Sequence, residues 1–289
     1  MAPIPAANRP TARGWFAIRH LPRVTRYRVR DPRWTLPPMT MAVLSDLHVG
    51  EPWVSLDLVR RIVAQINDLA PDLVVLPGDF LLDRNMWRYS RLVPADAIAA
   101  ALAGLRAPLG VFSSLGNHDW TDCDLARDTG HARNSVIEAF AAAGLTLLRN
   151  QSRPVPHGAG GFWLVGTDSQ RARSEKRGGR TRYVSYLDAE AAFANVPVGA
   201  PAIHLAHEPD WFANGDSRAF LQISGHTHGG QTRIFGRTPL VPSEYGSRYA
   251  AGHIQENGNH LIVSRGIGYS GLPLRIGVPP EIVMVEIGA

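Results

Sequence analysis

Short apolar runs alternate with helical patterns in the first half of the chain. The runs Met41–Leu44 and Leu73–Leu76 have the length and composition of buried strands, and polar residues follow each of them. Between them, apolar residues recur at spacings of three and four from Leu58 to Leu69, which predicts an amphipathic helix that ends before Pro71. The alternation continues with an alanine-rich helix and a third strand, over residues 95–105 and 110–114. Strands that alternate with helices predict an α/β fold.

The second half of the chain is richer in strands. Five strand-like runs are predicted, over residues 162–166, 202–206, 221–224, 261–264 and 282–287. Ser135 and Glu138 have the spacing of a capping box at the start of a helix that closes at Gly144. The segment 171–182 is polar, basic and glycine-containing, which predicts a loop. No linker divides the chain, so we expect one domain over residues 37–289 with its sheets between helices.

The positive charge of the chain is concentrated at its N-terminus. The 289 residues carry a formal net charge of +5, but residues 1–34 alone carry +7, from eight arginines and one acid, Asp31. The rest of the chain therefore sums to −2, and residues 1–36 are predicted to form a basic arm before a nearly neutral domain. This distribution argues against a nucleic-acid partner, since neither a basic groove interleaved with aromatic residues nor a nucleic-acid motif is present.

Targeting signals are missing from the sequence. No apolar run approaches the roughly 20 residues of a membrane-spanning helix, and the N-terminal segment lacks the apolar stretch and cleavage site of a secretion signal. The single cysteine, Cys123, excludes an intrachain disulfide and a cysteine-based metal site. We therefore expect a cytoplasmic protein. Apolar residues lie among the arginines of the arm, so the arm could contact an anionic membrane surface or pack against the domain.

Side chains that bind metals gather where the predicted strands end. They are Asp46, His48, Asp79, Asn117, His118, Asp119, His207, His226 and His228. Sheets of this kind bind ligands beyond the carboxyl ends of their strands, so we expect these side chains to converge. Imidazole and carboxylate groups suit divalent ions such as Mn²⁺, Fe²⁺, Zn²⁺ or Co²⁺. Seven ligands suffice for two ions if one carboxylate bridges them, and two ions can hold the attacking and departing oxygens of a phosphoryl transfer.

The ordered set Asp46-x-His48, Gly78-Asp79, Gly116-Asn117-His118-Asp119, His207 and Gly225-His226-Thr227-His228 resembles the calcineurin-like metallophosphoesterases. The resemblance covers the chain from about Met41 to its C-terminus. It implies a four-layer α/β/β/α sandwich, in which helices flank two mixed β-sheets, and a binuclear metal centre. By this resemblance, Asp46, His48 and His228 hold one metal and Asp79 bridges the two. The second metal is completed by Asn117, His207 and His226.

The same resemblance implies roles in catalysis. His118 would stabilise the phosphoryl oxygens or protonate the leaving group, and Asp119 would orient it through a hydrogen bond. Asn117 would also hold a phosphoryl oxygen of the substrate. Arg265, in a glycine-rich turn after a predicted strand, is a further candidate for substrate contact. The family often has Gly-Asp-x-x-Asp, but here the second acid, Asp83, comes one residue later, which leaves its role open.

Three further segments resemble the small bacterial phosphodiesterase branch of this family: Ser45–His48, Gly229–Gln231 and Ser264–Gly268. This implies hydrolysis of a small phosphodiester by a hydroxide that bridges two divalent metal ions. The alternatives are a phosphomonoesterase and a pyrophosphohydrolase of lipid-linked substrates of the UDP-diacylglucosamine type. A non-catalytic interaction module on the same fold is the alternative from another class, against which the complete ligand set argues. The basic segment 171–182 is either a solvated loop or a lid that grips anionic groups of the substrate.

Overall fold

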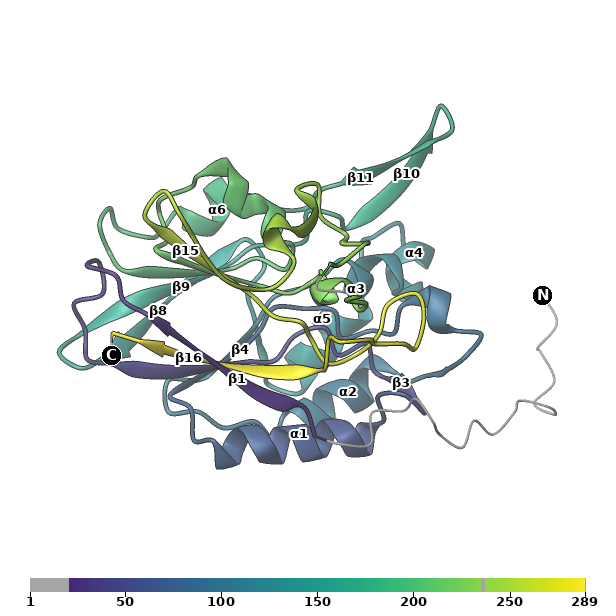
Figure 1. Cartoon of the computed structure of the whole chain (residues 1–289), viewed down its shortest axis with the longest axis horizontal. Coiled ribbons are helices and arrows are strands. Elements are labelled where there is room, and N and C mark those ends of the chain that lie inside the picture. Colours follow the sequence, from purple (N-terminus) through teal and green to yellow (C-terminus); the bar gives the residue numbers. More distant parts are fainter. Residues whose placement is uncertain (1–20, 235–236, 289) are drawn as a thin grey trace.

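Two six-stranded sheets lie face to face between layers of helices in the computed structural model, which describes residues 21–234 and 237–288 (Figure 1). The first sheet contains β1 (Arg23–Val29), β2 (Met39–Val43), β4 (Leu73–Leu76), β6 (Val111–Ser113), β7 (Thr146–Leu147) and β16 (Glu281–Ile287). The second contains β8 (Gln151–His157), β9 (Gly160–Gly166), β12 (Ala202–Leu205), β13 (Leu221–Ser224), β14 (Gly252–Glu256) and β15 (Asn259–Val263). Two short antiparallel pairs lie outside them, β3 (Gly50–Glu51) with β5 (Arg91–Leu92) and β10 (Arg173–Arg177) with β11 (Arg180–Val184).

Parallel strands form the centre of each sheet. The strand order is β1-β16-β2-β4-β6-β7 in the first sheet and β14-β15-β13-β12-β9-β8 in the second. The pairs β2–β4, β4–β6, β9–β12 and β12–β13 are parallel, whereas β16 runs antiparallel to β2 and β8 runs antiparallel to β9. Each sheet is therefore mixed, and the parallel strands of each present their carboxyl ends on one side.

The helices cover the outer faces of the sheets. The first sheet carries α1 (Leu56–Asp68), α2 (Ala95–Leu102) and α5 (Ser135–Ala142), and the second carries α6 (Ala189–Phe193). The short helices α3 (His118–Thr121) and α4 (Asp124–Asp128) follow β6, and the remaining turns of helix are η1 (Arg84–Met86), η2 (Pro209–Asn214), η3 (His228–Gly230) and η4 (Gly246–Tyr249). These layers confirm the predicted α/β/β/α sandwich. Within the described residues, no helix is both long and apolar enough to cross a bilayer.

Alternation along the strands divides the apolar residues between two cores. Met41 and Val43 of β2 point into the space between the sheets, where they meet residues of the second sheet such as Leu205 and Ile223. Ala42 and Leu44 point the other way, into the cluster that the helices cover. Both faces of β2 are thus buried, which explains why its sequence is a continuous apolar run.

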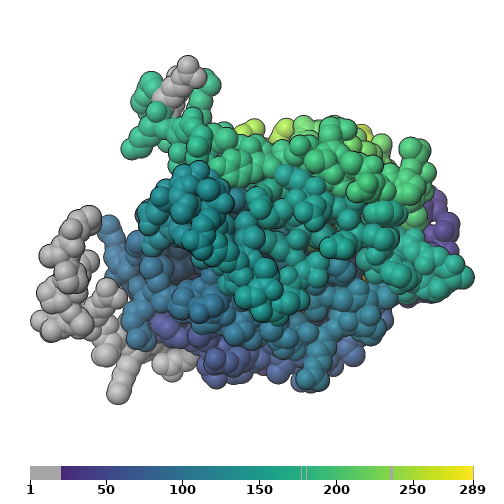
Figure 2. Space-filling model, turned by 180° about the vertical axis from the view of Figure 1, so that it is seen from behind, coloured from purple at the N-terminus to yellow at the C-terminus, as the bar shows by residue number. Residues whose placement is uncertain are grey.

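The segment 171–182 is a β-hairpin, so the predicted loop is wrong. Its strands β10 and β11 pair over Arg173–Val184, and the chain turns at Gly178 and Gly179, which both have positive φ. The hairpin protrudes from the body (Figure 2). Its sequence therefore lacks the alternation of apolar and polar residues from which a strand is predicted. The glycine pair was the signal that the sequence offered.

The four edge strands of the two main sheets, β1, β7, β8 and β14, were also unpredicted. β1 pairs with β16 in parallel, and its arginines alternate with partly buried residues along the open edge of the first sheet. The predicted arm of residues 1–36 therefore contributes a strand from Arg23 onward, and its first 20 residues lie outside the described part of the chain. β8 contains Pro154 and Pro156, which lack an N–H and are tolerated because β8 is an edge strand.

The N-terminus of α5 differs from the predicted capping box. Asn134 is the N-cap, and its side-chain oxygen accepts hydrogen bonds from the backbone N–H groups of Val136 and Ile137. Ser135 is already inside the helix, and Glu138 forms its ion pair with Arg133. The cap is therefore one residue earlier than the spacing of Ser135 and Glu138 suggested.

We predict that Asn134→Ala lowers the free energy of unfolding by about 1–2 kcal/mol, since it removes the cap of α5. It also removes the hydrogen bond that the Asn134 amide donates to the carbonyl of Asp119. The matched variant Ser135→Ala should change the free energy of unfolding by less than about 0.5 kcal/mol. Urea denaturation of both variants measures the difference, and a larger loss for Ser135→Ala would show that the capping box governs α5 after all.

Candidate metal centre

The predicted metal-type side chains converge where the strands of both sheets end. Asp46 and His48 follow β2, Asp79 follows β4, and Asn117 and His118 follow β6. From the second sheet, His207 follows β12, and His226 and His228 follow β13. Side-chain atoms close enough to share a metal ion form four groups: Asp46, His48 and His228; His48, Asp79 and His118; Asp79, His207 and His226; and Asp83, His118 and Asp122. Residues 180 positions apart in the sequence thus form one buried cluster.

The backbone at these positions is left-handed. Asp46, His48, Asp79, His226 and His228 have φ between 44° and 69°, and they are half of the non-glycine residues with positive φ in the described chain. This conformation costs about 1–3 kcal/mol for each residue other than glycine and is found mostly where the surrounding structure imposes it. It turns the chain sharply at each strand end, so that two residues of one turn can point toward the cluster.

Two glycines of the motifs are required by close approach. A Cβ added at Gly116 would overlap the carboxylate of Asp79, and one added at Gly225 would overlap Ser45 Oγ and the carboxylate of Asp46. The backbone of each turn therefore lies directly against a carboxylate from another strand. This explains why glycine precedes Asn117 and His226.

Asp79 lies at the centre of the cluster. Its Oδ2 atom is 3.1 Å from His207 Nε2 and 3.5 Å from His48 Nε2, so it faces imidazoles from both sheets. Its Oδ1 atom accepts a hydrogen bond of 2.8 Å from the backbone N–H of His118. Asp46 Oδ1 is 3.6 Å from His228 Nε2 on the other side. Asp79 thus lies between the imidazoles of His48 and His207, which come from different sheets.

Backbone carbonyls determine which nitrogen of two imidazoles faces the cluster. Nδ1 of His48 lies 3.0 Å from the carbonyl oxygen of Leu81, and Nδ1 of His207 lies 2.6 Å from that of Pro77. A carbonyl can only accept, so Nδ1 carries the proton in both rings. Burial lowers the pKa of His48, so its Nε2 presents a lone pair to the cluster. Burial also opposes the charged form of His207, but Asp79 outweighs burial and raises the pKa of His207 well above its usual value, so its Nε2 carries a proton that a bound cation would displace.

His228 has a different partner. The guanidinium of Arg275 lies 2.9 Å from Nδ1 of His228, and the same guanidinium donates to the carbonyl of Gly268. Because a guanidinium can only donate, Nδ1 accepts, and the proton of the neutral ring is on Nε2, which lies 3.1 Å from His48 Nε2. A neutral His228 can therefore bind a cation through Nε2 only if its proton moves to Nδ1 and the contact with Arg275 changes.

Several buried polar atoms of the cluster have no hydrogen-bond partner. They are Asp79 Oδ2, Asn117 Oδ1, His207 Nε2, His226 Nδ1 and His226 Nε2. An unsatisfied buried polar atom costs about 1–3 kcal/mol, and few occur in a native protein. All five unpartnered atoms in this cluster are of types that coordinate divalent metals. They therefore fit a metal centre better than a purely structural cluster.

The ionisation of the cluster is governed by burial and by the mutual fields of its members. Burial raises the pKa of Asp46, and the charge of His207 opposes that rise only in part. Burial also opposes ionisation of Asp79, but the neighbouring histidines, His207 first, hold its pKa well below the usual range. Burial and then the charge of His207 lower the pKa of His226 well below its usual value. The cluster thus contains an ionised carboxylate and a neutral imidazole side by side, which are the protonation states that bind metals.

Asp119 does not contact the ring of His118, in contrast to its predicted role. Its carboxylate instead accepts hydrogen bonds from four backbone N–H groups, those of Asp79, Phe80, Leu81 and Gly116, at 2.8–3.1 Å. These hydrogen bonds join the turn after β4 to the turn after β6, and they hold Asp79 in its left-handed conformation. Asp119 therefore positions the carboxylate at the centre of the cluster and not the histidine beside it.

The partner of His118 is Asp122, one turn further along α3. Its carboxylate forms a short hydrogen bond with Nδ1 of His118, and Asp83 Oδ1 lies 4.0 Å from the same nitrogen. Burial lowers the pKa of His118, but Asp79 and Asp122 outweigh burial and raise it to about 10. The spacing of four residues between His118 and Asp122 was the available signal for this pair. Asp83 also accepts from Ser270 Oγ and from the backbone N–H of Gly271.

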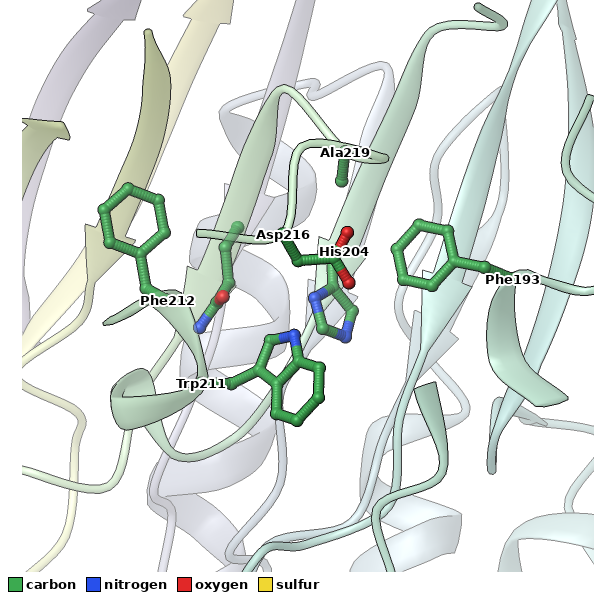
Figure 3. Close-up of a pocket in the computed structure, with 7 residues that line it drawn as sticks. Phe193, His204, Trp211, Phe212, Asp216 and Ala219 are labelled. Carbon is green, nitrogen blue, oxygen red and sulfur yellow. The ribbon is translucent and has the colours of Figure 1, made fainter. Parts of the chain in front are cut away.

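The polar groups of Arg265 and His204 have partners outside the cluster. The guanidinium of Arg265 forms an ion pair of 2.6 Å with the buried carboxylate of Glu281, so the structure gives no support to the predicted substrate contact. His204 occupies the opposite face of its strand from the cluster, where Nε2 lies 3.0 Å from Thr167 Oγ1 and the ring packs against Phe193 (Figure 3). This agrees with the alternation of side chains along β12.

A layered α/β sandwich with a buried cluster of histidines and aspartates at its strand ends defines a metal-dependent hydrolase of phosphate esters. The family model of the calcineurin-like phosphoesterases matches residues 39–230, and the chain belongs to this family. Phosphodiesterase YaeI of Escherichia coli is 31% identical over 280 residues, which is 95% of this chain and 89% of that protein. The uncharacterized metallophosphoesterase YkuE of Bacillus subtilis is 28% identical over 84% of this chain and 77% of its own length.

The chain is also similar to a solved structure, a dimetal phosphatase from Danio rerio. The two are 13% identical, with a TM-score of 0.45 over 79% of this chain and 87% of the phosphatase. The family model covers every strand end that contributes to the cluster, from Asp46 to His228.

Addition of Mn²⁺ to the metal-free protein should stabilise it. Cation binding satisfies the unpartnered atoms of the folded state and has no comparable site in the unfolded chain. At a metal concentration about 100-fold above Kd the free energy of unfolding should rise by about 2.7 kcal/mol for each site. Thermal unfolding with and without Mn²⁺ measures the effect, and Mg²⁺ and Ca²⁺ at equal concentration should give a smaller rise because they prefer oxygen ligands. Equal transition temperatures with and without Mn²⁺ would exclude a metal centre.

Asp119→Asn should destabilise the protein strongly. An amide accepts through one oxygen only, so at least one buried N–H loses a charge-assisted hydrogen bond, at a cost of roughly 2–4 kcal/mol. Asp122→Asn, which contacts only side chains at the edge of the cluster, should cost less than about 1 kcal/mol. Urea denaturation compares the two, and equal stability of both variants would contradict the positioning role of Asp119.

Proposed function

We propose that the protein is a metal-dependent phosphodiesterase that binds two divalent ions. The observation that carries the proposal is the presence of two neighbouring groups of possible ligands, Asp46 with His48 and His228, and Asp79 with His207 and His226. Asp79 Oδ2 lies 3.5 Å from His48 Nε2 of the first group, and the pair of His118 and Asp122 lies beside them. Two divalent ions supply a water-derived nucleophile and positive charge at the phosphoryl group of an ester. The donor set of imidazoles, carboxylates and one carboxamide suits Mn, Fe, Zn or Co.

The proposed ligands divide between the sheets. Asp46, His48 and His228 would hold one ion, and their atoms lie within 4.8 Å of one another. Asp79 would be shared between the two ions. Asn117, His207 and His226 would complete the second, and each of them contributes an atom without a hydrogen-bond partner.

His118 is the proposed proton donor to the leaving group. Its Nδ1 atom is engaged by Asp122, so the proton available to a substrate is on Nε2. The ring stands edge-on to His48, with ring centroids 4.9 Å apart, so it borders the cluster. Asp122 orients the ring and stabilises its positive charge, and after proton transfer His118 takes up another proton from water.

The choice of a diester over a monoester rests on similarity. YaeI, the relative that matches 95% of this chain, is named a phosphodiesterase. A phosphomonoesterase remains the first alternative, and a hydrolase of lipid-linked pyrophosphates the second. The first alternative predicts that a monoester is hydrolysed faster than a diester.

His118→Ala should lower kcat for bis(p-nitrophenyl) phosphate roughly 100- to 10,000-fold, the range for loss of a general acid. Its metal content should stay at about two equivalents, because His118 is not a proposed ligand. Asp122→Asn should lower kcat by about 10- to 100-fold, as expected of a group that orients another. His157→Ala, a histidine on the edge strand β8, should retain full activity and serves as the matched control.

The same assay with p-nitrophenyl phosphate separates the alternatives. Faster hydrolysis of the diester supports the proposal. Faster hydrolysis of the monoester would contradict the proposed preference for diesters but would still agree with the proposed metal centre. Bound metal without turnover of either compound would refute hydrolysis of small diesters. A protein that binds no metal after reconstitution would contradict the catalytic proposal as a whole and favour an interaction module.

A further inference from the structure

Exposed apolar side chains gather around the candidate metal centre. Among the described residues ten large apolar side chains are exposed, and eight of them belong to segments that lie beside the turns of the cluster. We call these eight the apolar rim: Tyr89, Leu92, Tyr183, Ile234, Leu240, Tyr245, Leu272 and Ile276, which are 42–79% exposed. Exposed apolar residues that cluster in this way mark interaction sites more often than scattered ones do.

Contacts with the cluster's own turns place the rim around it. Leu92 pairs with Gly50, two residues after His48, and Ile234 and Leu240 belong to the loop that follows His228. The backbone N–H beside Leu272, that of Gly271, donates to Asp83. On the side of the second sheet, the base of the β10–β11 hairpin is tied to Glu208, the residue after His207, and Figure 1 shows the hairpin and β3 at the same end of the molecule.

Arginine precedes the apolar residue in several of these loops. The pairs are Arg88-Tyr89, Arg91-Leu92, Arg182-Tyr183 and Arg233-Ile234, and Arg237 follows the last of them. Arg275 also precedes Ile276, but its guanidinium points inward to His228 and Gly268.

These arginines are largely without acidic partners. In the described part of the chain, Arg88, Arg91, Arg182 and Arg237 are exposed and make no ion pair. The acids of the same loops that lack an ion pair are Glu51 and Glu244. The rim is therefore both apolar and net positive.

We propose that the apolar rim docks this end of the molecule onto an anionic lipid bilayer. Single apolar side chains at the tips of separate loops can enter the headgroup layer, while an adjacent arginine remains among the lipid phosphates. A protein partner would instead require a continuous apolar core, whereas the rim residues come from separate segments with arginines among them. The contact is peripheral and reversible, because each loop contributes one or two side chains.

Docking in this orientation places the cluster opposite the lipid headgroups. The inference therefore names a substrate class for the proposed phosphodiesterase, namely phosphodiesters in which one alcohol carries a membrane-embedded chain. This second step rests on the proposed function, whereas the docking itself does not.

Cosedimentation with phosphatidylcholine vesicles, with and without phosphatidylglycerol, tests the docking. The protein should bind the vesicles with phosphatidylglycerol, and added salt should weaken binding without abolishing it. The triple variant Leu92→Ser/Ile234→Ser/Leu272→Ser should lower the partition coefficient at least about tenfold. Arg88→Gln and Arg91→Gln should each lower it about fivefold. Val198→Ser is the matched control, because Val198 is fully exposed but precedes the amino end of β12, away from the cluster.

Failure to bind the anionic vesicles, or equal binding by the triple variant and Val198→Ser, would overturn the proposal. Light scattering gives an independent check: concentration-dependent dimers that the triple variant abolishes, without vesicle binding, would assign the rim to self-association.

The substrate class is tested with a p-nitrophenyl diester that bears a long alkyl chain and is carried in the same vesicles. The triple variant should lose at least tenfold in its hydrolysis but retain full activity toward soluble bis(p-nitrophenyl) phosphate. Equal loss on both substrates would contradict the substrate class. Vesicle binding without any hydrolysis would leave the docking intact and refute the proposed function alone.

Discussion

The burial of two carboxylates, Asp46 and Asp79, where the two sheets meet is the constraint on which the site depends. Removing an ionised carboxylate from water costs several kcal/mol unless charges and hydrogen bonds compensate. The protein surrounds these carboxylates with imidazoles and with turns whose backbone is left-handed, and it leaves five polar atoms unsatisfied. Such an arrangement is stable only if other parts of the fold enforce it. The carboxylate of Asp119, bound to four backbone N–H groups, and the apolar core between the sheets provide that enforcement.

The sequence predicted the fold class and the cluster because both leave local signals. Buried parallel strands read as continuous apolar runs, and polar residues directly after them mark the edge of a sheet where ligands bind. Glycines before Asn117 and His226 follow from carboxylates that lie against the backbone there. The strands that escaped prediction are the sheet edges β1, β7, β8 and β14 and the short pairs β3–β5 and β10–β11 outside the main sheets. Their pairing depends on the backbone and on a neighbour, so the side chains show no apolar alternation.

The parts of the site that the sequence did not reveal depend on tertiary contacts. Asp119 and Asp122 are both acids near His118, and only the path of α3 decides that Asp122 meets the ring while Asp119 turns toward the backbone. Arg275 lies 47 residues from His228 and has no motif of its own, so its contact could not be foreseen. Arg265 looked available for a substrate because the strand β16, which brings Glu281 to it, is 16 residues away.

The cluster and its surroundings differ in how they are held. The ligating turns are fixed by backbone hydrogen bonds and by glycines with no free space around them, so their geometry tolerates little change. The residues of the apolar rim, by contrast, are 42–79% exposed. Catalysis at phosphorus needs turns with a fixed geometry, because a misplaced ligand no longer contributes its charge to the centre. The exposed segments around the cluster can change in sequence without disturbing the candidate metal centre. They can therefore adapt to the rest of a substrate, or to the surface that carries it. A family with one fold can thus serve many phosphate esters, and the loops, not the ligands, distinguish its members.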